Sequence, residues 1–287
     1  MGWIDTIVQG VLLGGLYALY ATGLSVIFGI MRLVNLAHGD LIVLGAFLVL
    51  VLSTTGINIV LAAAIVAPIM FVLGYGLQSL VLNRTLGRDV LPPLLITFGL
   101  SIILQNALLE LFSADSRRLH VGALDTASLA LGGGIAIGIM PLLCFLTAIA
   151  VIVVLNLLFF HTALGRAFRA TSDDAETAQL MGIDNRTIYA VAMGIAFFIC
   201  ALAGVFLGAR ANFDPSIGPA RLIYAFEAVI IGGLGSLWGT LAGGIVVGLA
   251  QTIGAQINPE WQILAGHVAF LGVLVVRPRG LFPRAAD

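Results

Sequence analysis

The chain has 287 residues, and its composition suits a lipid environment better than water. Apolar residues make up 60% of it, charged residues 9%, and the mean hydropathy is +1.13, whereas a soluble protein is about a quarter charged. So few charges cannot cover a water-facing surface, but lipid-facing atoms can be apolar. The formal net charge of −1, without a basic cluster, gives no indication of nucleic-acid binding.

All 13 basic residues are arginines, and the chain contains no lysine. A P-loop needs a lysine on the phosphates, so this chain cannot hydrolyse ATP by a standard P-loop. Any ATP-driven activity therefore needs a second polypeptide. Cys144 and Cys200 lie far apart in apolar runs, which favours buried structural roles over a metal site. The sequence predicts no cofactor, and it is not that of an enzyme.

The first half of the chain contains four predicted spans. Positions 6–31 carry no charge, which is enough for one tilted span. The next uncharged run, 41–83, is too long for one span and breaks at Ser53-Thr54-Thr55-Gly56, so it predicts a short second span and a third over about 59–82. A fourth span is predicted over 90–109, and the more polar stretch 113–140 follows it.

The second half begins with a fifth span over 142–160 and continues through a charge-rich loop, 161–186, to a sixth over 187–209. The run 222–256 breaks at 232–236 and is predicted as two pieces. A last span over 259–276 precedes a basic tail. Together these runs predict an all-α, polytopic transmembrane bundle of about 8–9 segments, one or two of them broken or re-entrant, forming one domain over 1–287.

The arginines predict the orientation, because basic residues favour the cytoplasmic side. With the N-terminus outside, nine arginines lie inside and four outside, which together account for all 13. The N-terminus is therefore predicted to be periplasmic, and the 161–186 loop and the C-terminus cytoplasmic. The inner set is Arg32, Arg84, Arg88, Arg166, Arg169, Arg186, Arg277, Arg279 and Arg284, and the outer set is Arg117, Arg118, Arg210 and Arg221.

Two interrupted segments, 35–39 and 232–236, are candidates for a solute path. Irregular backbone at membrane depth is tolerated only beside protein or a wet cavity, and paired interrupted segments in the two halves of a transporter indicate the solute path. Plain solvated turns are the alternative. The candidate path residues, which also include one carboxylate in an apolar run, are Asn35, His38, Gly39, Glu227, Gly232, Gly233, Gly235 and Ser236.

Glu227 has two readings. A carboxylate inside a membrane is costly and indicates a functional site, but Glu227 also fits the end of a span, where it meets water or Arg221. His267, in the last span, is more typical of a packed, hydrogen-bonded residue than of a proton relay. Glycines spaced by four, such as Gly10 and Gly14, predict close helix packing within the chain.

The 161–186 loop predicts a docking helix of about two turns, from Ser172 to Met181. Thr171-Ser172-Asp173-Asp174 is typical of a helix start, and Gly182 of a helix stop. Small and apolar residues three apart share one face, which either lies on the membrane surface or docks on a cytoplasmic partner. The candidate coupling residues are Arg166, Arg169, Asp173, Ala175, Glu176, Ala178, Met181 and Gly182.

Four stretches, in this order along the chain, resemble the permeases of branched-chain amino acid ABC importers, the LivH type. They are Val-Asn-Leu-Ala-His-Gly-Asp at 34–40, Gly-Arg-Ala-Phe-Arg-Ala at 165–170 leading to Ala-Gln-Leu-Met-Gly-Ile at 178–183, Ala-Phe-Glu-Ala-Val-Ile-Ile-Gly-Gly-Leu-Gly-Ser at 225–236, and Arg-Pro-Arg-Gly-Leu-Phe at 277–282. Glu176-Thr177-Ala178 is also similar to the Glu-Ala-Ala loop of importer permeases, although Thr177 departs from that pattern.

The resemblance implies a permease subunit of an ATP-driven importer that moves amino acids, branched-chain ones above all, across the bacterial inner membrane. It implies four kinds of partner: a second homologous permease chain, two cytoplasmic ATPase subunits, a periplasmic solute-binding protein and the lipid bilayer. Urea or short amides are alternative solutes. An ion-coupled secondary carrier or channel is a second alternative, which needs intramembrane ionisable groups, and only Glu227 and His267 qualify.

Overall fold

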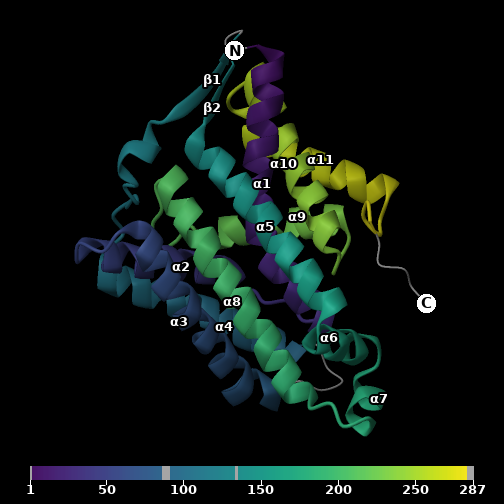
Figure 1. The fold of residues 1–287 in the computed structure, drawn as a ribbon. Helices are drawn as coiled ribbons and strands as arrows, with labels where there is room; N and C mark the ends of the chain where they lie inside the picture. Colours follow the sequence, from purple (N-terminus) through teal and green to yellow (C-terminus); the bar gives the residue numbers. More distant parts are fainter. Residues whose placement is uncertain (1, 86–90, 133–134, 283–287) are drawn as a thin grey trace.

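The structure is a computed structural model that describes residues 2–85, 91–132 and 135–282 (Figure 1). Arg88 and Arg284, two members of the predicted inner set, lie outside the described residues. The α-helices are α1 Trp3–Met31, α2 His38–Thr54, α3 Ile59–Leu80, α4 Leu91–Phe112, α5 Ile139–His161, α6 Ala163–Asp173, α7 Ala175–Leu180, α8 Asn185–Arg210, α9 Gly218–Gly232, α10 Leu237–Ile257 and α11 Trp261–Val276, with short 3-10 turns at Leu82–Arg84 and Gly122–Asp125.

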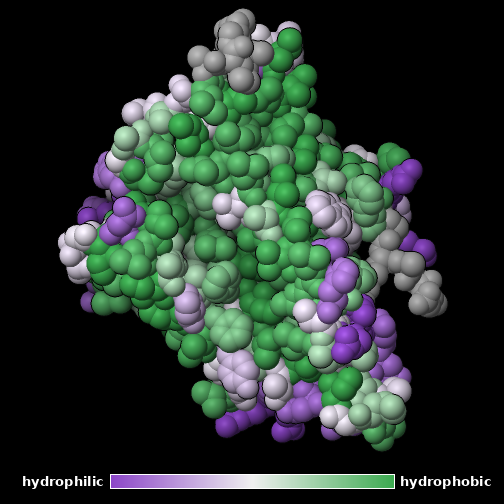
Figure 2. All heavy atoms as spheres, viewed as in Figure 1, coloured by the Kyte–Doolittle hydropathy of each residue, from purple (hydrophilic) through white to green (hydrophobic). Residues whose placement is uncertain are grey.

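The helices confirm a helical, polytopic membrane protein. Within the described ranges, six helices are long and apolar enough to cross a bilayer: α1, α3 with its 3-10 extension, α4, α5, α8 and α10; α2 and α11 are shorter apolar helices. The count of 8–9 segments remains a prediction. Hydrophobic residues cover most of the face in Figure 2, and hydrophilic residues gather at the end that holds α6 and α7.

Within the part of the chain that the structure describes, a small β-hairpin is the departure from the all-α prediction. Strands β1, Ser128–Gly132, and β2, Ile135–Gly138, pair antiparallel within the polar stretch between α4 and α5. The two strands are only five and four residues long, so their alternation of small and apolar residues is too short to predict strands. The stretch was therefore predicted only as polar.

The helices form two blocks with inverted orientation. In the first block a long helix, a short helix and a long helix follow one another as α1, α2 and α3, and α8, α9 and α10 repeat that order. α1 and α8 run in opposite directions, and each packs most extensively on the third helix of the other block, α10 and α3 respectively (Figure 1). An outer helix, α4 or α11, follows each block. Inverted repeats of this kind occur in many transporters, and none was predicted here.

The linker before each short helix has the same backbone geometry. The Ala37 N–H donates to Asn35 Oδ1 at 3.0 Å, and the Ser216 N–H donates to Asp214 Oδ1 at 2.9 Å. In both linkers a second hydrogen bond joins the backbone N–H three residues on to the carbonyl of the Asn or Asp. A turn that closes on an Asn or Asp side chain therefore starts both α2 and α9.

The two short helices begin against each other inside the molecule. A Cβ atom on Gly39 would overlap the Gly218 carbonyl oxygen, and a Cβ on Gly218 would overlap the carboxylate of Asp40. Backbones approach this closely only where both residues lack a side chain. The crossing of α2 and α9 is thus fixed by one glycine from each block.

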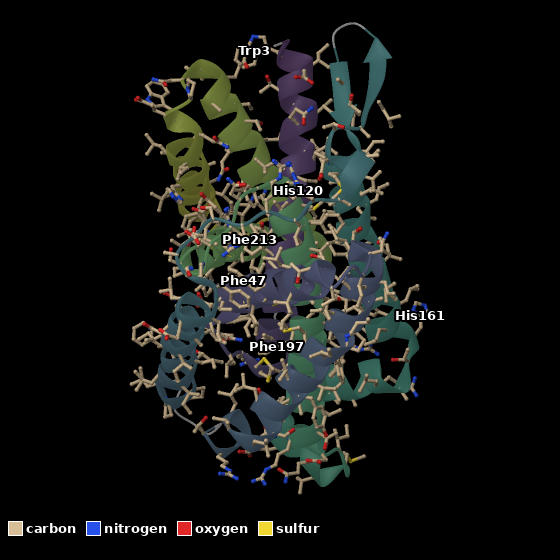
Figure 3. All side chains as sticks on the ribbon, turned by 90° about the vertical axis from the view of Figure 1, so that its left-hand side faces the viewer. Trp3, Phe47, His120, His161, Phe197 and Phe213 are labelled. Carbon is tan, nitrogen blue, oxygen red and sulfur yellow. The ribbon has the colours of Figure 1, made fainter. Side chains whose placement is uncertain are left out.

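Small residues and aromatic rings fill the rest of the core. A Cβ on Gly244 of α10 would lie 2.6 Å from the Gly14 carbonyl oxygen of α1, which confirms the predicted close packing of spaced glycines within the chain. Phe47 stacks on Phe112 with ring centroids 4.5 Å apart and meets Phe213 edge-on at 4.9 Å. Figure 3 shows Phe47 and Phe213 between the helices, at mid-height in the molecule.

Candidate functional site

The first predicted path segment lies in the interior of the chain. Asn35 and His38 are buried. His38 Nε2 lies 2.7 Å from the Tyr20 carbonyl oxygen, more than half-way along α1, and His38 Nδ1 lies 3.6 Å from the sulfur of Cys200 on α8. α2 therefore begins well inside the bundle. In this conformation Asn35 and His38 reach no surface of the chain, so a path-lining role for them remains a prediction.

Asp40 is a buried carboxylate that sequence reasoning did not assign to a site. Ser101 of α4 donates from Oγ to Asp40 Oδ2 at 2.5 Å, and Gln105 donates to that hydroxyl at 3.1 Å. Among the described residues no cation lies within 4 Å of the carboxylate. It occupies the first turn of α2 and contacts Gly218 at the start of α9, so the positive ends of two helix dipoles face it.

The second predicted path segment is the linker between α9 and α10. Gly232 and Gly233 are buried at the end of α9, and Gly235 has a φ of 80°. Ser236 accepts from the Gly239 N–H at 3.1 Å and starts α10. The predicted break in the long apolar run is therefore present.

The glycines of the two predicted path segments pack against different parts of the chain: Gly39 against Gly218, Gly232 against Gly239, and Gly235 against Gly29. In the inverted repeat, 214–218 is the counterpart of 35–39 and contacts it, whereas the counterpart of 233–236 is the α2–α3 linker, 55–58. The sequence reasoning had treated 211–220 only as a loop. The signal that relates the two corresponding linkers of the repeat is an Asn or Asp followed four positions later by Gly, as in Asn35–Gly39 and Asp214–Gly218.

The tail after α11 completes the carbonyl end of α9. The Leu281 N–H donates to the Ile231 carbonyl at 2.8 Å, and the Phe282 N–H donates to the Gly232 carbonyl at 3.0 Å. The last carbonyls of a helix have no partner within the helix. The tail that the sequence marked only as basic therefore also has a structural role at the α9–α10 linker.

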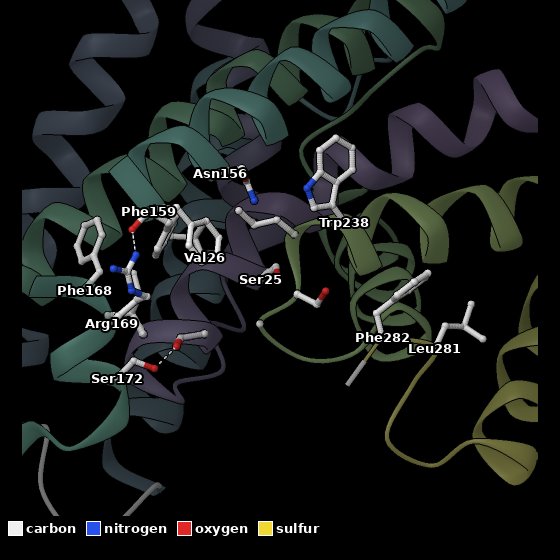
Figure 4. Close-up of a pocket in the computed structure, with 16 residues that line it drawn as sticks. Ser25, Val26, Asn156, Phe159, Phe168, Arg169, Ser172, Trp238, Leu281 and Phe282 are labelled. Atoms are coloured by element: carbon white, nitrogen blue, oxygen red, sulfur yellow. Dashed lines mark hydrogen bonds between the residues drawn. The ribbon is translucent and has the colours of Figure 1, made fainter. Parts of the chain in front are cut away.

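A cavity of about 520 Å³ lies beside this linker (Figure 4). Its walls come from the second half of α1, the end of α5, α6, the α9–α10 linker and the tail. Gly235 and Ser236 of the predicted path set and Arg169 of the predicted coupling set all line it. Two groups that the sequence treated separately thus share one cavity.

The loop helix differs from the prediction. Two helices stand where one helix from Ser172 to Met181 was expected: α6 starts after Thr162, whose hydroxyl accepts from the Gly165 N–H at 3.0 Å, and α7 starts after Asp174. Arg166 is exposed on α6, and Arg169 is half-buried. The prediction missed α6 because its basic sequence was read as a connection to the capping residues that follow.

The ends of α7 follow the expected chemistry. Asp174 Oδ1 accepts from the N–H groups of Glu176 and Thr177. The Thr177 hydroxyl and these N–H groups lower the pKa of Asp174, so its charge persists at the helix start. Gly182 has a φ of 85°, and the Ile183 N–H reaches back to the Ala178 carbonyl at 3.1 Å, which is the closing pattern that a glycine stop permits.

The exposed face of α7 is not the predicted one. Ala178 is buried, and Ala175 is half-buried, with its carbonyl accepting from Asn185 Nδ2 at 2.6 Å. Leu180 and Met181 are instead 86% and 79% exposed. The predicted face of Ala175, Ala178 and Met181 is wrong at Ala178, because that side chain packs on the chain itself. Asp173 and Glu176 are exposed beside it.

A short series of contacts joins α6 to the α9–α10 linker. Ser172 donates from Oγ to the Gly29 carbonyl of α1 at 2.6 Å. A Cβ atom on Gly235 would lie 3.1 Å from Gly29 Cα, so the backbones of α1 and the linker touch at that point. α6 and the α9–α10 linker therefore both contact α1 at Gly29.

Glu227 is paired with His267, a contact that sequence reasoning missed. His267 Nδ1 of α11 contacts Glu227 Oε1 of α9. Glu227 is buried, His267 is partly exposed, and the second carboxylate oxygen has no hydrogen-bond partner among the described residues. Glu227 and His267 are isolated ionisable residues in two consecutive apolar runs. That pattern is the sequence signal that could have indicated their pairing.

The sequence is similar to transport permeases over almost its whole length. The family described as the permease component of the branched-chain amino acid transport system matches residues 6–276. The high-affinity branched-chain amino acid transport system permease protein BraD of Pseudomonas aeruginosa is 30% identical, over 98% of this chain and 96% of BraD. LivH of Escherichia coli K12, described in the same words, is 27% identical over the same shares. The fructose import permease protein FrcC of Rhizobium meliloti is 28% identical over 82% of this chain and 72% of FrcC.

These matches join the helical, multi-pass architecture to a known family, and the chain belongs to the family of branched-chain amino acid transport system permease components.

Proposed function

We propose that the chain is the permease subunit of an ATP-driven importer of branched-chain amino acids. The observation that carries this proposal is the 30% identity to BraD over 98% of the chain. The absence of lysine, and with it of a P-loop, requires that ATP be hydrolysed by a separate subunit. A second permease chain, two ATPase subunits and a periplasmic binding protein complete the proposed transporter.

Transport by the complete assembly tests the proposal. The permease is co-expressed with the transporter genes beside it, reconstituted into proteoliposomes and supplied with ATP and the binding protein. We expect ATP-dependent uptake of radiolabelled leucine that unlabelled isoleucine and valine compete for. The similarity to FrcC makes fructose an informative second substrate. If fructose or urea is taken up and leucine is not, the proposed solute is wrong but the transporter class stands. Uptake driven by a proton gradient without ATP would overturn the class.

The proposed orientation places α6 and α7 in the cytoplasm and the N-terminus in the periplasm. Trp3, at the start of α1, lies at the opposite end of the molecule from α7 (Figure 1, Figure 3), which agrees with the arginine distribution. Cys144 and Cys200 are buried, so single cysteines can be added to the wild-type chain. A membrane-impermeant maleimide added to intact spheroplasts should label Ser128→Cys, in strand β1 beside the N-terminus (Figure 1), and not Glu176→Cys. The reverse pattern would invert the topology.

The proposed contact with the ATPase centres on the end of α7. Leu180 and Met181 expose two large apolar side chains next to exposed carboxylates, which is the composition of a docking contact with a polar rim. Leu180→Glu should reduce the ATPase that co-purifies with the permease, whereas Gln179→Ala, an exposed polar residue of the same helix, should not. Full co-purification and normal transport by Leu180→Glu would exclude α7 as the coupling element.

A further inference from the structure

The cavity beside the α9–α10 linker has the lining of an amphipathic site. Its volume of about 520 Å³ falls within the range of roughly 300–1,000 Å³ typical of ligand pockets. Phenylalanines from α5, α6 and the tail, a tryptophan from α10 and several aliphatic side chains make up the apolar part of its wall, and a few polar groups interrupt them (Figure 4). The lining suits a ligand that is mostly hydrocarbon and carries one polar end.

Among the described residues that line the cavity, Arg169 is the one that carries a charge. It donates from Nη1 to the Phe159 carbonyl oxygen, and its guanidinium carbon lies 5.2 Å from the centroid of the Phe160 ring. Within the described residues no carboxylate lies within 4 Å of this guanidinium. An arginine carries five N–H donors in a planar fork that suits phosphate oxygens. The cavity therefore presents a positive charge with which an anionic ligand group can form an ion pair.

Ser25 supplies a second polar contact. Its side chain is buried in the wall of the cavity on α1, and its hydroxyl has no hydrogen-bond partner among the described groups. A serine in a helix usually satisfies its hydroxyl on the carbonyl of the preceding turn. A buried hydroxyl left without a partner costs free energy, so a bound acceptor, such as an ester carbonyl, would stabilise it.

The rim of the cavity indicates where the ligand comes from. Phe160 and Trp238 line the cavity and are 60% and 47% exposed. Both belong to membrane-spanning helices, near the end that holds α6. Exposed aromatic rings at this depth are typical of the interface between lipid and water, and basic pockets between helices on the cytoplasmic side are typical sites for anionic lipid headgroups.

We propose that this cavity binds an anionic phospholipid of the inner leaflet, with the phosphate on Arg169, an ester carbonyl on the Ser25 hydroxyl and an acyl chain along the aromatic wall. The site lies against Ser172 and Gly235, the two ends of the contact series that joins α6 to the α9–α10 linker. A bound lipid would therefore stabilise the packing of α6 near the α9–α10 linker.

Photo-crosslinking in the assembled transporter tests the proposal. The complex is placed in phosphatidylcholine nanodiscs that contain a small fraction of phosphatidylglycerol with a diazirine in its acyl chain, irradiated, digested and mapped by mass spectrometry. Peptides around Phe160 and Trp238 should be labelled well above the lipid-facing peptide around Val72, which serves as the reference for bulk lipid. Arg169→Gln should lower the cavity labelling about fivefold, the effect of one arginine near a membrane surface, whereas Arg169→Lys should retain most of it.

Three controls make the result decisive. Arg166→Gln removes an exposed arginine of α6 that does not line the cavity and should leave the labelling unchanged, whereas Ser25→Ala should lower it about twofold at constant charge, since one hydrogen bond is lost. Diazirine phosphatidylcholine should not enrich in the cavity, and excess inorganic phosphate should not compete. Labelling at the Val72 level, equal labelling by phosphatidylcholine, competition by phosphate, or no labelling because a second permease chain covers the rim would each overturn the proposal.

Discussion

The two inverted blocks share a backbone but differ in what surrounds it. In both, a short helix starts after an Asn or Asp turn and ends in a linker that contains a glycine of positive φ, Gly56 in one block and Gly235 in the other. A Cβ on Gly56 would meet open space, whereas one on Gly235 would lie 3.1 Å from α1. Both blocks therefore have a linker with a glycine of positive φ, but only the α9–α10 linker contacts α1 next to α6. The two linkers are equivalent in backbone geometry and differ in their contacts.

The outer helices differ in a related way. α4 is tied to the short helix of its block by a hydroxyl, Ser101 on Asp40, and α11 by an imidazole, His267 on Glu227. Asp40 lies at the start of α2, where helix dipoles compensate its charge. Glu227 lies in the middle of α9, away from both ends of that helix. We therefore expect the second block to depend more on its polar pair than the first.

The largest expected effect is at the crossing of the blocks. Gly39→Val forces a side chain into the Gly218 carbonyl and should destabilise the protein by about 3 kcal/mol or more, since neither backbone can move away from the other. Gly76→Val is the matched control, because a Cβ at Gly76 on α3 meets no atom within 4 Å. Thermal unfolding in detergent, followed by size-exclusion chromatography, measures both. Equal melting temperatures for the two variants would contradict the crossing.

The second expected effect separates the two polar pairs. His267→Ala leaves the buried Glu227 carboxylate without its partner and should cost about 1–3 kcal/mol, whereas Ser101→Ala should cost about 1 kcal/mol or less. In a double-mutant cycle, Glu227→Gln should recover part of the loss caused by His267→Ala, because the coupled pair is removed together. If Ser101→Ala proves the more harmful substitution, helix dipoles do not compensate Asp40 as argued here.

The third prediction compares the two linkers in transport. Gly56→Ala and Gly235→Ala both place a Cβ on a residue of positive φ, a strain of about 1–2 kcal/mol, but only Gly235→Ala also pushes against Gly29. ATP-driven uptake should fall about tenfold, the equivalent of about 1.4 kcal/mol, for Gly235→Ala and change little for Gly56→Ala. Equal losses in the two variants would show that the connection to α6 is irrelevant to transport.

The smallest expected effect is at the contact between α6 and α1. Ser172→Ala removes the hydrogen bond to the Gly29 carbonyl, worth about 0.5–1.5 kcal/mol. We expect normal assembly and ATP hydrolysis with about two- to fivefold less uptake per ATP hydrolysed. Ser172→Thr retains a hydroxyl and serves as the control. An unchanged ratio of uptake to hydrolysis in Ser172→Ala would remove this contact from the coupling series.

The sequence predicted the helices better than the relations between them. Long uncharged runs identify α1, α3, α5 and α8 directly, because a bilayer requires about 20 apolar residues per helix. Local chemistry also identified the break at 232–236 and the glycine stop at Gly182. Local chemistry alone could not give the partner of His267, which lies on α9, 40 residues earlier in the chain, or the burial of Ala178, which depends on how α7 packs on its neighbours α6 and α8.

The inverted repeat was missed for a specific reason. Its signature is a turn in which the side chain of Asn35 or Asp214 accepts from the backbone N–H two residues later. The residues around the two turns differ, so the two copies share geometry and little sequence. The prediction paired 35–39 with 232–236 because both looked interrupted, although interruption is a property of every linker between two short apolar runs. Shared hydrogen-bond chemistry, and not shared polarity, marks the related segments.

The cap on α9 has a consequence for the order of synthesis. At the end of α2 the hydroxyls of Ser53, Thr54 and Thr55 bond to carbonyls three residues earlier, so that helix end is finished as soon as it leaves the ribosome. The end of α9 waits for Leu281 and Phe282, which follow α10 and α11 in the chain, so the cap can form only after both helices have been synthesised. The nascent chain therefore holds an unfinished α9–α10 linker until late in its biogenesis, and a premature stop before Leu281 would yield a fully inserted protein whose second linker is never locked.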